Sequence, residues 1–146
     1  MLGLIALHKH WCTADAVKQF VSARLPVEPT TLNKPLEDCG QQQSMFFRLS
    51  VWYSLIYVVV EGYRDLGLKD EKIEALLSDS VKVESLRRFR NAVFHFQEDP
   101  IGPKLMEFLE TEESETWVRE LNVAFKAFFE RKLPVQMFLE AIRSQA

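Results

Sequence analysis

Three polar side chains that can act on phosphate groups lie close together in the segment 86–97, among large apolar residues. Arg90 offers a permanently charged fork of N–H donors, Asn91 can both donate and accept hydrogen bonds, and His95 belongs to the side-chain type that titrates near neutrality. An arginine can hold a phosphodiester through two N–H groups, and a histidine can move a proton to or from a ribose hydroxyl. The segment is therefore the candidate site.

The spacing of these residues sets a condition on the local structure. Five residues of an ideal helix turn through roughly 140°, so Arg90 and His95 share a helix face only in part. They converge better if the helix distorts or ends near His95, or if two chains bring their copies together across a twofold interface. Because Pro100 lacks an N–H donor and disfavours a helical Asp99, we expect the helix to end within a few residues of His95.

The run Arg90-Asn91-Ala92-Val93-Phe94-His95 resembles the arginine–polar–spacer–histidine signature of the HEPN (higher eukaryotes and prokaryotes nucleotide-binding) domains, which are small helical bundles. The resemblance covers roughly residues 41–132. It implies a metal-independent endoribonuclease without cofactor that cleaves single-stranded or loop RNA, as a toxin or defence component with an antitoxin partner. Arg90 would bind the scissile phosphate, His95 would act as general base or acid, and Asn91 would orient either of them. The ribose 2′-hydroxyl would attack the adjacent phosphorus and leave a cyclic phosphate.

Two observations favour other readings of the same residues. Some toxin members of the family carry a tyrosine two residues after the histidine, which a partner nucleotidylates, and Gln97 stands at that position here. The cleft could instead belong to a noncatalytic module that binds nucleotide or RNA, or that serves as a scaffold for a partner such as a nucleotidyltransferase. A histidine among Phe94, Phe96 and Val93 is also typical of a hydrogen-bonded core, and an arginine beside it of a helix-surface ion pair.

Charge is distributed unevenly along the chain. The net charge of −3 argues against a protein that coats nucleic acid nonspecifically, because such binding depends on many lysine and arginine contacts to phosphates. Positive charge nevertheless gathers around the motif, where Glu84 is the single acid within nine residues. We expect four neighbours of the motif to contact RNA or nucleotide: Lys82, Arg87, Arg88 and Gln97.

Cysteine and histidine usage gives no sign of a metal site or a disulfide scaffold. Cys12 and Cys39 lack paired spacing, and His8 and His10 lie two residues apart, whereas ligands at i and i+4 would share a helix face. A nucleophilic pair of either cysteine with His95 has no supporting local pattern but stays open. A reducing cytoplasm is the default compartment for such a chain.

No membrane association is expected. The apolar start, residues 2–7, is too short for a signal core, and the apolar stretch 51–60 is bounded by Arg48 and Glu61.

The 146 residues fit one domain, and the periodicity predicts an all-α, antiparallel bundle of five to seven helices resembling the HEPN fold. Residues 1–40 hold an N-terminal helix up to Leu25, which Thr13 can cap, followed by a proline-rich connection over 26–40. Residues 41–132 form the bundle, with its core in the segments 41–66, 80–97 and 114–132. Residues 134–146 end the chain in a short helix that begins at Pro134.

The strongest helical pattern predicts a central helix whose apolar stripe is core rather than a cofactor site. Gly62 within it hints at a close helix approach, and Gly67 can end it in a left-handed cap. Polar residues predict the later helix starts: Asp70, then Ser78 or Ser80, then Thr111 or Ser114. The stripe comprises Met45, Leu49, Trp52, Ile56, Val59, Tyr63 and Leu66.

The chemistry also favours a homodimer. One motif supplies a single histidine, yet attack by an internal hydroxyl benefits from both a base and an acid, which two copies of His95 provide. Apolar residues of the 45–66 helix, together with Phe89, Phe94 and Phe96, offer surface for an isologous interface whose axis passes near Arg90 and His95.

Overall fold

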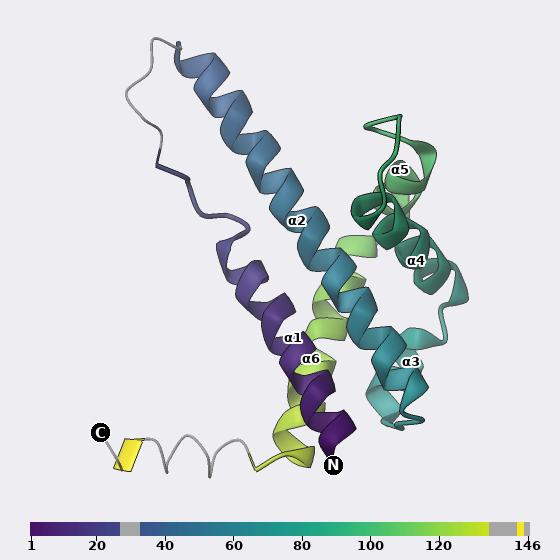
Figure 1. Ribbon diagram of the computed structural model, residues 1–146. Coiled ribbons are helices and arrows are strands. Elements are labelled where there is room, and N and C mark those ends of the chain that lie inside the picture. The colour runs from purple at the N-terminus through teal and green to yellow at the C-terminus, as the bar shows by residue number, and fades with distance from the viewer. Residues whose placement is uncertain (27–32, 135–142, 145–146) are drawn as a thin grey trace.

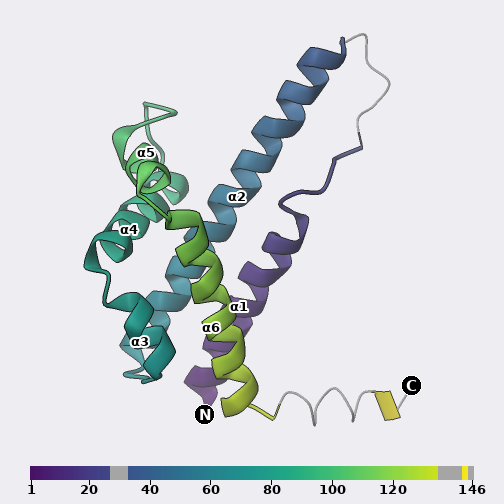
Figure 2. The same ribbon diagram turned by 180° about the vertical axis from the view of Figure 1, so that it is seen from behind.

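The computed structural model describes residues 1–26, 33–134 and 143–144, and within them it contains α-helices and no strand. This confirms the all-α bundle. The elements are α1 (Leu2–Phe20), α2 (Lys34–Asp65), α3 (Glu71–Leu77), α4 (Ser80–Phe94), α5 (Pro103–Glu110) and α6 (Ser114–Lys132). The first two helices run antiparallel side by side, and α4 and α6 also pack against the long α2 (Figures 1 and 2). Helix α3 packs against α6, and α5 packs against α4 and α6.

The core forms where α2 packs against α1, α4 and α6. As the periodicity predicts, Trp52, Ile56, Val59 and Tyr63 are buried. The two ends of the stripe are not, since Met45 is 39% exposed and Leu66 is 44% exposed. Aromatic rings join the layers in two groups, each with centroid distances of 5.4 to 6.1 Å: Tyr53 with Phe89 and Phe108, and Tyr63 with Phe125 and Phe128.

Gly62 of α2 faces the Leu7 side chain of α1. A Cβ atom at this position would come within 2.6 Å of the Leu7 side chain, so only glycine fits without displacement. Gly67 follows α2 with a φ of 61°, the left-handed conformation that glycine adopts at little cost. Both predictions for these glycines are confirmed.

The predicted start of α2 was wrong by several residues. The Asn33 side chain accepts a hydrogen bond from the backbone N–H of Leu36, and Pro35 stands in the first turn, where its missing N–H costs nothing. The helix therefore begins at Lys34 and takes in Gly40, which the sequence placed in the connection over 26–40. The Gln41 side-chain amide donates to the Leu25 carbonyl at 2.9 Å and accepts the Leu25 backbone N–H at 3.0 Å. These two hydrogen bonds connect α2 to the segment that follows α1.

One other predicted helix start differs from the structure. Helix α1 runs without a break through Thr13, whose hydroxyl donates to the Lys9 carbonyl, so Thr13 is not a cap. Helix α4 begins at Ser80, one of the two predicted starts, and its side-chain cap is Asp79.

Asp70 caps α3, and α6 begins at Ser114, as predicted. The predicted C-terminal helix falls mainly on residues 135–142 and 145–146, which lie outside the described part of the chain.

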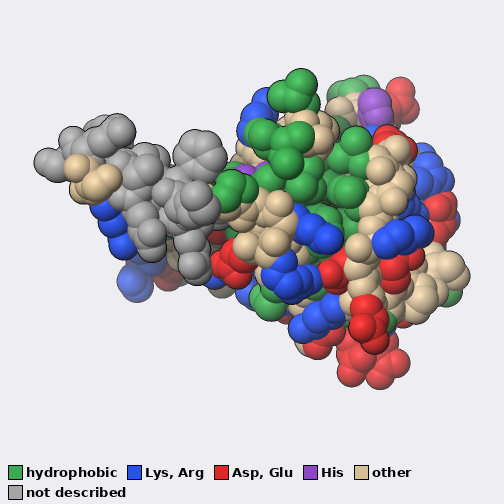
Figure 3. Space-filling view, turned by 90° about the horizontal axis from the view of Figure 1, so that it is seen from below, with side chains coloured by type: hydrophobic (Ala, Val, Ile, Leu, Met, Phe, Trp, Pro, Cys, Tyr) green, Lys and Arg blue, Asp and Glu red, His purple; other side chains and the backbone are tan. Residues whose placement is uncertain are grey.

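One described helix, α2, is long and apolar enough to cross a membrane by length and composition alone. Core helices of water-soluble proteins pass the same test, and α2 is covered by three neighbouring helices. At the end of the molecule where α1 begins, Figure 3 shows hydrophobic side chains among charged ones, and the exposed apolar residues of this end are Met1, Leu2, Ile5 and Leu66.

Candidate functional site

Helix α4 carries the motif and is fixed at both ends. The Asp79 carboxylate accepts the backbone N–H of Lys82 at the start, and Leu86 and Phe89 are fully buried against the core. The helix ends at Phe94, and His95 has extended backbone angles while its N–H still donates to the Asn91 carbonyl at 3.0 Å. The prediction that the helix ends near His95 is confirmed. Because His95 follows the helix with an extended backbone, its direction is not set by the helical spacing from Arg90.

Arg90 is held against α2 from several directions. Its Nη1 donates to the Asn91 side-chain oxygen at 3.0 Å, its Nη2 forms an ion pair with Glu61, and the guanidinium lies over the Tyr57 ring at 5.3 Å from the centroid. Its Nε is buried without a hydrogen-bond partner among the described residues. A guanidinium has five N–H donors, so one on each terminal nitrogen remains for a ligand. The side chain is 20% exposed.

Tyr57 serves this arrangement as a neutral ring. Burial raises the pKa of its hydroxyl, and the nearby Glu61 charge acts in the same direction. The phenol therefore stays protonated at neutral pH and offers a π face to Arg90 rather than a second negative charge.

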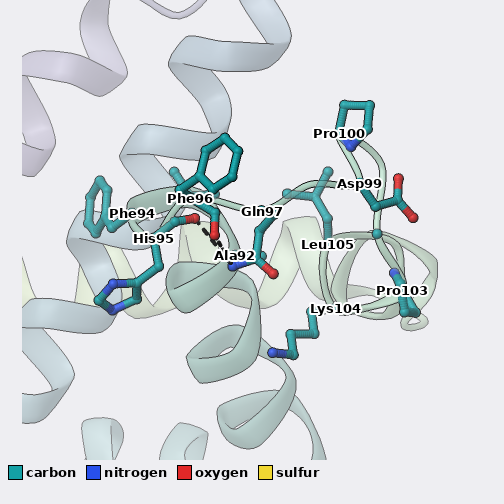
Figure 4. Close-up of a pocket in the computed structure, with 12 residues that line it drawn as sticks. Ala92, Phe94, His95, Phe96, Gln97, Asp99, Pro100, Pro103, Lys104 and Leu105 are labelled. Atoms are coloured by element: carbon teal, nitrogen blue, oxygen red, sulfur yellow. Dashed lines mark hydrogen bonds between the residues drawn. The ribbon is translucent and has the colours of Figure 1, made fainter.

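His95 is exposed, unlike a core histidine. It is flanked by Phe94, 46% exposed, and Phe96, 91% exposed. Figure 4 shows these residues around a cavity of about 370 Å³ between the end of α4 and the start of α5. No hydrogen bond joins the imidazole to Arg90 or to the Asn91 side chain in the described residues. The structure thus pairs Arg90 with Asn91 and leaves His95 free to meet a ligand.

The basic residues near the motif each have a carboxylate partner. The pairs are exposed to different degrees: Lys82 with Asp79 at 3.0 Å, Arg87 with Glu84 at 2.6 Å, and Arg88 with Glu107 of α5 at 3.1 Å. Exposed pairs of this kind contribute little free energy and exchange readily, so a phosphate can displace the carboxylate. Gln97 instead donates its amide N–H groups to the His95 and Phe96 carbonyls, at 3.3 and 2.9 Å, and holds the segment after α4 in place.

Three residues of the site escaped the sequence reasoning. Glu61 and Tyr57 lie 29 and 33 positions before Arg90, and Lys104 lines the cavity from the first turn of α5. The available signal was Glu61 itself, which directly follows the apolar run 49–60, because a charge beside buried residues needs a partner. Lys104 gave no signal, since its position depends on how the segment after α4 folds back.

The other reactive side chains lie elsewhere. The Cys12 thiol contacts the His8 ring at 3.5 Å on α1. Burial raises the pKa of Cys12, and Asp15 adds to the shift, while burial lowers the pKa of His8. The thiol therefore stays protonated and is a weak nucleophile. In the described ranges no group of three or more histidine, cysteine or acidic side chains is placed to hold a metal ion.

Comparison of the chain with protein-family models, with curated proteins and with solved structures gives no match. The functional argument therefore depends on the site itself.

Proposed function

We propose that this protein is a metal-independent endoribonuclease of HEPN type that cleaves single-stranded or loop RNA. The observation that carries the proposal is the end of α4: the helix stops at Phe94, so an exposed His95 stands one turn after an arginine whose fork is oriented by Asn91. This supplies a phosphate-binding group near the end of α4 and a proton-transfer group directly after the helix.

The proposed reaction needs only these side chains and the RNA. A base removes the proton of the ribose 2′-hydroxyl, the 2′-oxygen attacks the adjacent phosphorus, and the bond to the 5′-oxygen breaks. The departing oxygen takes a proton from an acid, so the products are a cyclic phosphate and a 5′-hydroxyl. Arg90 binds the non-bridging oxygens through its remaining N–H groups, and Asn91 keeps its guanidinium plane in place.

Two protomers supply the base and the acid as two copies of His95, which is why we propose a homodimer. Exposed aromatic side chains offer a surface for it, with Phe94 46% exposed at the end of α4 and Phe47 56% exposed on α2. Phe89 cannot contribute, contrary to the sequence-based expectation, because it is fully buried against Tyr53 and Phe108. A cytoplasmic location and an antitoxin partner belong to the same proposal.

The test is cleavage of labelled single-stranded RNA in the presence of a chelator. We expect cleavage by the unmodified protein and none by His95→Ala or Arg90→Ala, with Val123→Ala on the exposed face of α6 as a matched control. Equal cleavage by all variants would identify a contaminating nuclease.

A second candidate is a noncatalytic module that binds RNA or nucleotide, or a partner such as a nucleotidyltransferase. The ion pair of Arg90 with Glu61 favours it, because a neutralised guanidinium stabilises transition-state charge less well. This candidate predicts binding of labelled RNA that Arg90→Ala weakens, with no cleavage product after long incubation.

A further inference from the structure

The charged side chains that line the cavity beside His95 are Lys104 and Asp99. The basic face of α4 consists of Lys82, Arg87, Arg88 and Arg90. Each cation of that face is paired with a carboxylate, Arg90 included. Lys104, which lines the cavity, has no ion pair within the described residues. A phosphate that approaches Lys104 therefore displaces no carboxylate, whereas one that approaches Arg87 or Arg88 must.

An exposed aromatic ring stands at the same cavity. Phe96 directly follows His95, lines the cavity, and is 91% exposed, the highest exposure among the large hydrophobic side chains of the described residues. It makes no ring contact within the described protein, so its faces are available. Bases of single-stranded nucleic acid stack on such rings.

The walls of the cavity are set by local hydrogen bonds. The Gln97 amide bonds the two preceding carbonyls, and an Asp99 carboxylate oxygen accepts the N–H of Ile101 at 3.0 Å. Phe96 comes from the segment after α4 and Lys104 from the start of α5, so the ring and the cation are supplied from two sides of the space (Figure 4). Its volume of about 370 Å³ lies within the range of small-ligand sites, roughly 300–1,000 Å³.

We infer that this cavity binds one nucleotide of a single-stranded RNA next to the bond that is cut, with its base stacked on Phe96 and a phosphate on Lys104. The inference rests on the proposed function and adds to it the position of the strand. The RNA crosses the segment between α4 and α5, and the paired cations of α4 contribute less to RNA binding than Lys104 does.

The test uses a single-stranded, 2′-O-methylated RNA carrying 2-aminopurine, which cannot be cleaved by internal attack and whose fluorescence is quenched on stacking. Full-length protein is compared with Phe96→Ala and with Lys104→Ala. Matched controls are Val81→Ala, an exposed apolar residue of α4, and Lys9→Ala on α1. We expect quenching by the unmodified protein. Phe96→Ala should abolish the quenching and lower the affinity about tenfold. Lys104→Ala should bind less tightly, and the slope of the logarithm of its affinity against the logarithm of salt concentration should be smaller by about one. Both controls should bind as the unmodified protein does.

Three results would overturn the inference. If Phe96→Ala and Lys104→Ala bind as the unmodified protein does while Arg90→Ala binds less, the strand lies elsewhere and the proposed function survives. If Phe96→Ala instead shifts the sedimentation of the protein from dimer to monomer, Phe96 packs against a second copy of the chain and not against a base. If the unmodified protein neither binds nor cleaves any single-stranded RNA, the proposed function fails together with the cavity.

Discussion

At the scale of single residues, Arg90 is distinguished from the other cations of α4 by its fixed orientation. Arg87 and Arg88 have exposed ion pairs, whereas Arg90 is positioned by Asn91, Glu61 and the Tyr57 ring together. The proposed cleavage therefore depends on the orientation of the Arg90 guanidinium as well as on its charge.

Replacing Arg90 by lysine tests this requirement. An ammonium keeps the charge but cannot bond Asn91 and Glu61 in one plane while it also binds a phosphate. We expect Arg90→Lys to reduce the rate of RNA cleavage by about 100-fold, a loss comparable to that of an oxyanion donor. Arg88→Lys, at an exposed pair, should leave the rate nearly unchanged. Similar rates for the two variants would show that charge alone suffices.

Glu61 competes with RNA for Arg90 in this account. Glu61→Gln removes the negative charge and keeps the side-chain size, so a phosphate meets an unopposed guanidinium. We expect the affinity for single-stranded RNA to rise by up to about fivefold, the equivalent of an ion pair of about 1 kcal/mol. Glu84→Gln, which frees Arg87, is the matched control in a filter-binding or anisotropy titration. A fall in affinity with Glu61→Gln would contradict this expectation and show that Glu61 aids RNA binding more by positioning Arg90 than it hinders binding by competing with the phosphate.

At the scale of elements, the motif helix depends on its cap. The Lys82 backbone N–H, bonded to the Asp79 carboxylate, and the Lys82 ammonium hold the pKa of Asp79 below its ordinary value of 3.8. A carboxyl whose pKa is lowered in the folded state stabilises the protein above its unfolded-state pKa, and that contribution is lost as the pH falls through the folded-state value.

We expect Asp79→Ala to lower the free energy of unfolding at pH 7 by about 1 kcal/mol, the usual value of an N-cap. Asp79→Asn should keep the cap, and urea unfolding of this variant should show less loss of stability below pH 3.8 than the unmodified protein does. Equal acid sensitivity of the unmodified protein and Asp79→Asn would show that other carboxyl groups account for it.

Two glycines of α2 make a matched pair. Gly40 has open space around its Cα, and Gly62 faces the buried Leu7 side chain. Alanine favours a helix over glycine by about 1 kcal/mol, so Gly40→Ala should raise the free energy of unfolding by up to that amount. Gly62→Ala should lower it instead, by roughly 1–3 kcal/mol, because the new methyl group overpacks the α1–α2 contact. Thermal and urea unfolding of both variants would measure the difference, and a gain in both would refute the close packing.

The elements show what the sequence can and cannot predict. Helical periodicity located the centre of α2, and Pro100 located the end of α4, because both signals arise from residues that are close in the chain. The early start of α2 was missed, since Pro35 and Gly40 are typical of loops when the Asn33 cap is not recognised. Within the site, Arg90 and Asn91 were predicted together as neighbours in sequence. The pairing of Arg90 with Glu61 joins residues 29 positions apart and depends on how α2 and α4 pack.

At the scale of the whole molecule, the account requires two chains. Phe94→Asp places a charge on the proposed isologous interface, so it should shift the protein from dimer to monomer at micromolar concentration and remove RNA cleavage with it. Val123→Asp, at an equally exposed apolar position on α6, should change neither. Sedimentation velocity measures the first effect. An unmodified protein that is already monomeric yet cleaves RNA would contradict the composite site.

The most direct measurement of the central claim is the chemistry of the RNA ends. Single-stranded RNA is incubated with the protein in a chelator, and its products are identified by mass spectrometry, alongside the same RNA with one 2′-deoxynucleotide at the cleavage position. The account predicts a cyclic phosphate and a 5′-hydroxyl from the first RNA, no cleavage at the deoxy position of the second, and neither product with His95→Ala. Cleavage of the deoxy position, or equal cleavage by His95→Ala, would contradict it.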